Sequence, residues 1–156
     1  MMNLKPEELL KMMQKQEAFL KDVQTMSVKV GLPKKTASIK EKGISIIIIG
    51  AAHEYGQGDM HRSFLRVPFA VRKDELAKII QSQFELGKSK LNAKLALGRV
   101  GALASGISKK AFTNQGYGTW ADIKPETKKR KKSSKVLIDT STLSQSITWE
   151  VEKNAS

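Results

Sequence analysis

The sequence of 156 residues contains no cysteine, only two histidines and four prolines, and few aromatic side chains, which make up 6% of the residues. Without cysteine, disulfide bonds, cysteine nucleophiles and thiolate metal sites are excluded. Acidic residues are also scarce: 15 Asp and Glu face 28 Lys and Arg, which leaves a formal net charge of +13. This charge favours a polyanion or an acidic protein surface as partner, without choosing between them. No apolar run reaches the roughly 18 to 20 residues that a membrane span needs, so we expect no membrane partner.

Hydrophobic residues are nevertheless 40% of the chain, which is enough for a packed core. The length is typical of one domain, and we expect residues 1–156 to form it. The N-terminus carries Glu7 and Glu8 in an amphipathic pattern, rather than the basic and then apolar pattern of a signal peptide. We therefore expect a soluble protein that is made in the cytoplasm.

Five isoleucines lie between two glycines in residues 43–50, and the rest of the chain is expected to pack on this segment. A short apolar run of β-branched residues predicts a strand that is buried on both faces. Alternating apolar residues from Val28 to Leu32 predict a second, half-buried strand that pairs antiparallel with the first. Residues 28–69 are thus predicted to form a strand pair and the loop that follows it.

A helix is predicted over residues 6–25. Proline is tolerated in a first helical turn and acidic residues suit its positive end, and Pro6, Glu7 and Glu8 meet both conditions. An apolar stripe then continues to Val23 at spacings that fit a helix.

A second helical region is predicted over residues 72–111, as two helices or as one bent helix. Small residues such as Gly98 and Gly101 crowd its second half. Because glycine destabilises a helix interior, such a cluster predicts close backbone approach, a kink or a break. We place the break near 87–92 or 98–106.

From residue 113 to residue 140 the sequence shows no pattern that predicts a helix or a strand. We expect these residues to form an extended basic loop. Within it, residues 124–135 hold seven basic residues and one acid, and charges at this density repel one another. Alternating apolar residues then predict a strand over 143–152 with one buried face. The predicted fold class is α+β: a small, mostly antiparallel sheet packed by an N-terminal helix and a long helical region, with a basic loop before the C-terminal strand.

Four side chains that could bind a metal ion lie within nine positions: His53, Glu54, Asp59 and His61. Their spacing is not that of a metalloprotease helix, in which a second histidine follows on the next turn. No G-x-S-x-G nucleophile elbow and no phosphate-binding P-loop occur either. We therefore expect no enzyme, no catalytic residue, no metal site and no cofactor, and metal analysis of the purified protein would test the hydrolase alternative.

The basic segment has three interpretations: contact with nucleic acid, docking on an acidic protein surface, or a solvated loop without a partner. Few aromatic residues lie near it, and no base-stacking platform is visible. We therefore place protein docking above sequence-specific nucleic-acid binding. Tyr117, Trp120 and Trp149 are interpreted as structural or interface anchors.

Four short motifs follow one another along the chain: HEYG at 53–56, RSFL at 62–65, GTW at 118–120 and LIDTSTLSQSI at 137–147. In this order, over roughly residues 28–151, the chain resembles the phage virion morphogenesis family. These are the small neck and tail-completion proteins of tailed bacteriophages, including the Mu G-like proteins. Two positions depart from the family pattern: Ser63 stands where proline is usual, and Ser141 stands where glycine, which adopts positive φ freely, is usual.

The resemblance implies a non-enzymatic structural protein of the virion that forms a ring, expected to be six-fold, at the head–tail junction and joins tail to head. Its partners would be copies of itself and other neck, connector and tail proteins, with non-specific contact to DNA that passes through the ring. A tail terminator that caps the tail tube and a basic DNA-binding packaging or architectural protein are the alternatives. The candidate contact residues belong to the motifs and the basic loop: Tyr55, Arg62, Phe64, Arg66, Trp120, Lys128, Lys129, Arg130, Lys131 and Lys132.

Overall fold

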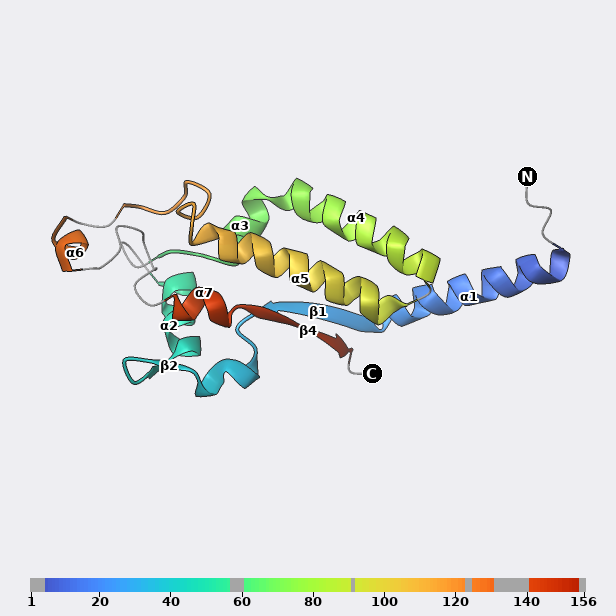
Figure 1. Ribbon diagram of the computed structural model, residues 1–156, viewed down its shortest axis with the longest axis horizontal. Coiled ribbons are helices and arrows are strands. Elements are labelled where there is room, and N and C mark those ends of the chain that lie inside the picture. Colours follow the sequence, from blue (N-terminus) through green and yellow to red (C-terminus); the bar gives the residue numbers. More distant parts are fainter. Residues whose placement is uncertain (1–4, 57–60, 91, 123–124, 131–140, 155–156) are drawn as a thin grey trace.

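The structure is a computed structural model that describes residues 5–56, 61–90, 92–122, 125–130 and 141–154. The fold is α+β, as predicted, with helices packed on short antiparallel strands (Figure 1). In chain order the elements are α1 (Pro6–Gln24), β1 (Met26–Gly31), the 3₁₀ helix η1 (Lys34–Ser38), β2 (Lys40–Glu41), β3 (Ile44–Ser45), α2 (Ile46–Tyr55), α3 (Arg66–Val71), α4 (Lys73–Lys90), α5 (Ala93–Ala111), α6 (Pro125–Arg130), α7 (Thr142–Ser146) and β4 (Thr148–Lys153). Among the described residues, no helix is both long and apolar enough to cross a lipid bilayer.

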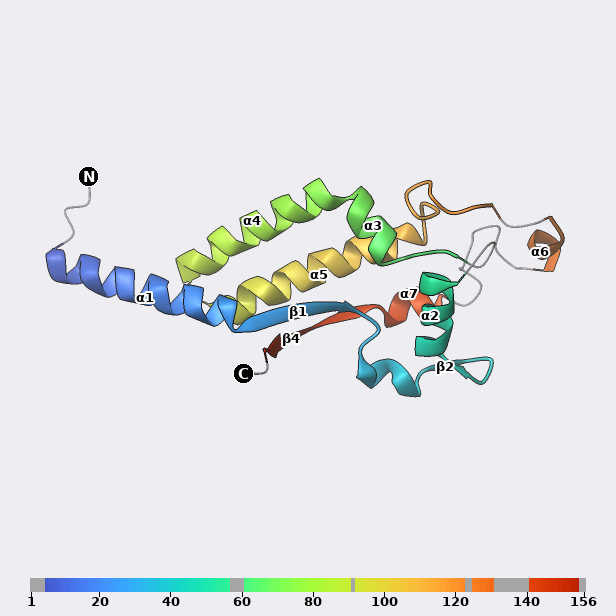
Figure 2. The same cartoon turned by 180° about the vertical axis from the view of Figure 1, so that it is seen from behind.

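Helix α5 is the central element of the fold. It lies between α4 on one side and the β1–β4 sheet on the other, an arrangement that Figures 1 and 2 show from opposite sides. Its buried face consists mostly of Ala, Ser and Gly. A Cβ atom added at Gly101 would lie 2.6 Å from Cγ of Trp149 and 2.8 Å from Cγ2 of Val28, closer than non-bonded carbon atoms can approach. The small residues of this helix therefore serve close approach to the sheet, and they do not break it.

The predicted helical regions are observed with small differences at their ends. Helix α1 corresponds to the helix predicted over 6–25, and α4 and α5 to the region predicted over 72–111. The break between α4 and α5 falls within the interval 87–92, where Asn92 caps α5 by accepting a hydrogen bond from the Leu95 N–H at 2.9 Å.

The pairing predicted for the first strand is wrong. Strand β1 pairs antiparallel with the C-terminal strand β4, so that Val28 lies opposite Val151 and Val30 opposite Trp149. These four residues share the face that packs on α5. The segment after β1 forms its own two-residue hairpin, β2–β3, which turns at Lys42 and Gly43, both with positive φ.

The central isoleucine strand is also a wrong prediction, because only Ile44 and Ser45 form a strand and the segment from Ile46 onwards forms helix α2. Ile46, Gly50 and Glu54 are buried at four-residue spacing, whereas Ile48 remains 63% exposed. This is the burial pattern of a helix with one packed face. A short apolar run cannot be assigned to strand or helix from periodicity alone, and here tertiary packing overrides the strand preference of isoleucine.

The prediction for the last third of the chain needs two corrections. The strand predicted over 143–152 begins only at Thr148, because Thr142–Ser146 form the short helix α7. The basic loop predicted over 113–140 contains the helix α6, whereas residues 123–124 and 131–140 lie outside the described part.

Candidate functional site

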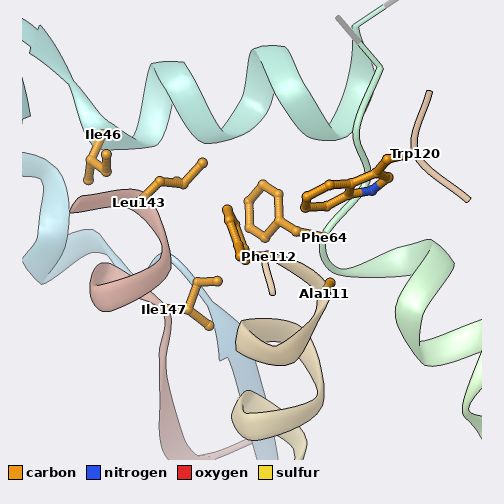
Figure 3. Packing of buried hydrophobic residues seen from close by; sticks show 7 residues of the cluster. All are labelled: Ile46, Phe64, Ala111, Phe112, Trp120, Leu143 and Ile147. Carbon is orange, nitrogen blue, oxygen red and sulfur yellow. The ribbon is translucent and has the colours of Figure 1, made fainter. Parts of the chain in front are cut away.

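The motif segments, far apart in the sequence, meet at one corner of the fold. Phe64, from the RSFL motif, lies at the centre of this corner, with ring centroids 5.5 Å from Phe112, which is in turn 5.5 Å from Trp120. Figure 3 shows these rings between α2, the end of α5 and α7. The buried cluster comprises Ile46, Phe64, Ala111, Phe112, Trp120, Leu143 and Ile147.

Glu54, the last buried residue of α2, organises the polar side of this corner, and its side chain is only 3% exposed. Its Oε1 accepts hydrogen bonds from Ser63 Oγ (2.8 Å), Arg66 N (3.1 Å) and Arg66 Nε (3.0 Å). Its Oε2 accepts from the backbone N–H groups of Phe64 (2.9 Å) and Leu65 (3.0 Å). One carboxylate thus satisfies three consecutive N–H groups at the start of α3 that have no partner within that helix.

These hydrogen bonds also set the ionisation of Glu54. Burial raises the pKa of the carboxyl group, but the hydrogen bonds from Ser63 and from the backbone of Arg66 and Leu65, together with that from the Arg66 side chain, outweigh it. The pKa of Glu54 therefore lies below the ordinary value for glutamate. The carboxylate is charged at neutral pH and acts as a buried anchor for the residues after it.

Ser63 makes hydrogen bonds through its hydroxyl group, which the proline that is usual at this position in the phage virion morphogenesis family could not make. Its Oγ donates to Glu54 and also accepts a hydrogen bond from Val67 N at 3.0 Å. The backbone around it is held from the other side, because Trp120 Nε1 donates to the Ser63 carbonyl oxygen (3.0 Å) and Ser108 Oγ donates to that of Phe64 (2.6 Å). Residues 63–66 are thus held by side chains from α2, from α5 and from the loop that carries Trp120.

The outer surface of the corner is formed by Tyr55 and Arg66. The Arg66 guanidinium carbon lies 4.6 Å from the centroid of the Tyr55 ring, which is 69% exposed. Arg66 Nη2 also donates to the Glu54 carbonyl oxygen at 2.8 Å. An aromatic ring and an arginine held in place from beneath are residue types that are enriched at protein interfaces.

The predicted contact residues divide between surface and core. Tyr55 and Arg66 are exposed side by side, as an interface would require. Phe64 and Trp120, by contrast, are 1% and 6% exposed, and Arg62 is 8% exposed. Phe64 and Trp120 belong to the hydrophobic cluster that fills the corner, so they are core residues rather than surface contacts, and Arg62 is buried as well.

The basic residues of the predicted loop are placed only in part. Lys129 lies on α6 with an exposed side chain, and Lys128 and Arg130 lie on the same helix. Lys131 and Lys132 lie outside the described residues. Over Pro125–Arg130 a six-residue helix replaces the extended chain that charge repulsion predicted.

The four side chains considered for a metal site are not arranged as one in the described part of the chain. Among the residues that the structure describes, no three His, Cys, Asp or Glu side chains could share a metal ion. Glu54 directs both oxygens at α3, His61 is exposed, and Asp59 lies outside the described residues.

Sequence reasoning missed the extent of apolar surface that the chain leaves uncovered. On α1, Leu10 and Met13 are 57% and 59% exposed, and Leu9 and Met12 are also exposed. The amphipathic stripe of α1 was the available signal, but the stripe does not tell how much of it the chain itself covers. A second group of exposed apolar side chains, near β2, β3 and α2, comprises Ile39, Ile44 and Ile48.

Comparison with protein-family models, with curated proteins and with solved structures gives no significant match to this chain. The resemblance therefore depends on the four motifs themselves. All four motifs contribute residues to the same corner of the fold. These residues are Glu54, Phe64, Trp120, and the pair Leu143 and Ile147.

Proposed function

We propose that this chain is a non-enzymatic structural subunit of a tailed-bacteriophage virion, which assembles with copies of itself into a ring at the head–tail junction. The observation that carries the proposal is the group of exposed apolar side chains on α1, together with separate exposed isoleucines on β3 and α2. Helix α1 lies at one end of the molecule (Figure 1). A monomeric protein rarely leaves such surfaces uncovered. Surfaces that differ from each other favour head-to-tail contacts, which generate rings when the rotation closes.

The corner around Glu54 fits a subunit that must keep its shape while neighbouring subunits bind its surfaces. Its carboxylate, the Ser63 hydroxyl and the Trp120 indole fix the backbone beneath the exposed Tyr55–Arg66 pair. A contact surface that is rigid before binding loses less conformational entropy when the complex forms.

The position in the particle can be tested by labelling a C-terminal tag on intact virions of the phage that encodes this chain. Lys153 and Asn154 are exposed at the end of β4, so a tag placed after them is accessible. We expect label at the head–tail junction in negative-stain images. Label on the capsid interior or the tail tip, or its absence from particles, would refute the assignment.

Deletion of the gene distinguishes the two ring functions. A completion protein that joins tail to head leaves full heads beside free tails of normal length, and purified protein added to such an extract restores joined particles. A tail terminator instead leaves tails of uncontrolled length, because nothing stops the tube.

The net charge of +13 favours DNA binding as a second candidate function. A titration of duplex DNA at increasing salt tests it, because each phosphate contact makes the affinity fall more steeply with salt. Tight, steeply salt-dependent binding by a monomeric protein would favour this function over the ring.

A further inference from the structure

The apolar stripe of α1 continues beyond the body that it packs against. Near the end of α1, Phe19 is buried and meets Phe84 of α4 with ring centroids 5.4 Å apart. Towards the N-terminus Met12 follows on the side of Phe19, seven positions before it. Leu9 and Met13, one turn apart, form an apolar strip that lies roughly a quarter to a third of a turn round the helix from Phe19. All three side chains are exposed. Figures 1 and 2 show that this half of α1 extends past the ends of α4 and α5, where no other described element reaches it.

The body of the molecule has an apolar groove in which such a helix could lie. Two adjoining hollows of about 230 and 130 Å³ share Val28, Ile80 and Val100 as lining residues. Strand β1 forms one wall with Val28 and Val30, and α4 the other with Leu76 and Ile80. Ile80 is 46% exposed although its surroundings are apolar, so the groove is open to an occupant.

We propose that the N-terminal half of α1 lies in the groove between α4 and β1 of a second copy of this chain. The helix cannot turn back into its own groove, because only Thr25 separates α1 from β1. That junction is fixed, since Asn154 N donates to the Thr25 carbonyl oxygen at 2.7 Å and Asn154 Nδ2 to that of Gln24 at 3.2 Å. The recognition is that of an amphipathic helix in an apolar groove, with side chains three and four positions apart as anchors.

Charge favours another copy as the occupant of the groove. The α1 segment carries four acidic residues against three lysines, although the whole chain has a net charge of +13. Two bodies of this protein repel each other, whereas an α1 helix approaching a basic body does not. The helix begins with Glu7 and Glu8, which places negative charge at the tip that would enter the neighbour.

The size of the contact fits a closed assembly better than an isolated pair. The free half of α1, about 13 residues, spans about 20 Å, whereas a stable interface takes roughly 20 to 30 residues a side. In a ring every chain contributes its helix to one neighbour and its groove to the other, which doubles the surface that each chain buries. The inference thus deepens the proposed function and rests on it for the closure of the ring.

The absence of cysteine allows a direct cross-linking test in the full-length protein. Chains carrying Met13→Cys are mixed with chains carrying Ile80→Cys and treated with a flexible bismaleimide, and hetero-cross-linked dimers are quantified by mass spectrometry. The matched control replaces Met13→Cys by Lys15→Cys, on the opposite, charged face of α1. We expect at least a five-fold higher yield with Met13→Cys, and equal yields or no hetero-cross-link would overturn the docking.

The double variant Met13→Cys/Ile80→Cys separates this inference from the proposed function. A ladder of cross-linked species that ends at one closed size supports both docking and the ring. A product that stops at the dimer supports docking but refutes the ring. Wild-type label at the head–tail junction, combined with no cross-link in purified virions, would refute the docking and leave the proposed function standing.

Discussion

Replacing Glu54 with glutamine tests whether one buried carboxylate holds the corner between α2 and α3. The substitution conserves volume and removes the charge and one of the two acceptor oxygens. In the structure Oε1 accepts three hydrogen bonds and Oε2 accepts two. Whichever way the amide of glutamine is oriented, at least two donors then face an NH₂ group instead of an oxygen.

The expected loss of stability follows from these geometries. A hydrogen bond to a charged group contributes about 1.5–3 kcal/mol, and a buried donor left without an acceptor costs a similar amount. Two such losses give a decrease of about 3–6 kcal/mol in the free energy of unfolding, of the order measured when one partner of a buried ion pair is removed. This is a large part of the roughly 5–15 kcal/mol that stabilises a typical domain.

The matched control is Glu75→Gln, which also removes a carboxylate paired with an arginine. Arg72 Nε donates to Glu75 at 2.6 Å, but both side chains are 43% exposed, and exposed pairs contribute less than about 1 kcal/mol. Both variants are compared with wild type by urea unfolding, followed by far-ultraviolet circular dichroism at one protein concentration. If Glu54→Gln is no less stable than Glu75→Gln, the corner does not depend on the Glu54 carboxylate.

The pH dependence of the same pair of proteins gives an independent check. The pKa of Glu54 is lowered in the folded state, so its contribution is fully present above the unfolded pKa of about 4.3. It is lost as the pH falls through the lower, folded pKa. We expect the difference in unfolding free energy between wild type and Glu54→Gln to shrink in that acidic range. A difference that instead grows with acidification would contradict the direction of the pKa shift.

Other substitutions test the packing of α5 and the turn before α7. Gly101→Ala should destabilise the protein by about 1–3 kcal/mol, because the new Cβ overlaps Trp149 and Val28, whereas Gly98→Ala in the same helix meets nothing within 4 Å and should stabilise it by about 0.5–1 kcal/mol. Equal effects in thermal unfolding would show that α5 does not approach the sheet this closely. Ser141 has φ +58°, so Ser141→Gly should raise the melting temperature by removing a strain of about 1–2 kcal/mol, partly offset by glycine's greater entropy loss on folding, and Ser141→Ala should not. A lower melting temperature for Ser141→Gly would contradict the left-handed conformation.

Elements with a strong local pattern could be predicted from the sequence, and elements decided by tertiary contacts could not. Helix α1 has a proline and acids in its first turn, and its stripe identifies it without reference to the rest of the fold. The break before α5 lies in one of the two predicted intervals, 87–92, whereas the small residues at 98–106 lie within one continuous helix. The segment of α2 was misassigned because isoleucine favours strands. In the structure the segment is a helix that packs Gly50 near Leu143 and Phe64, and these tertiary contacts cannot be read from the local sequence.

The candidate site shows the same division. The motif segments meet in one corner, where Ser63 donates a hydrogen bond to Glu54, but the sequence could not say which side chains point inwards. Large aromatic residues near a polar loop fit an interface and a core equally well, and Trp120 belongs to the core because its indole N–H finds the Ser63 carbonyl. Of the predicted contact set, the exposed Tyr55–Arg66 pair and Lys129 are the side chains that the structure describes at the surface.

The periodicity of the sequence cannot show why one half of α1 is left uncovered. The stripe has the same apolar character from Leu9 to Val23, so the sequence predicts one helix with one packed face. The structure divides that face near Phe19, because α4 ends and α5 begins there. Where a stripe is longer than the body beneath it, the surplus contacts none of the other elements that the structure describes. A surplus stripe and an open apolar groove within one chain form an incomplete core, and a neighbouring copy can complete it.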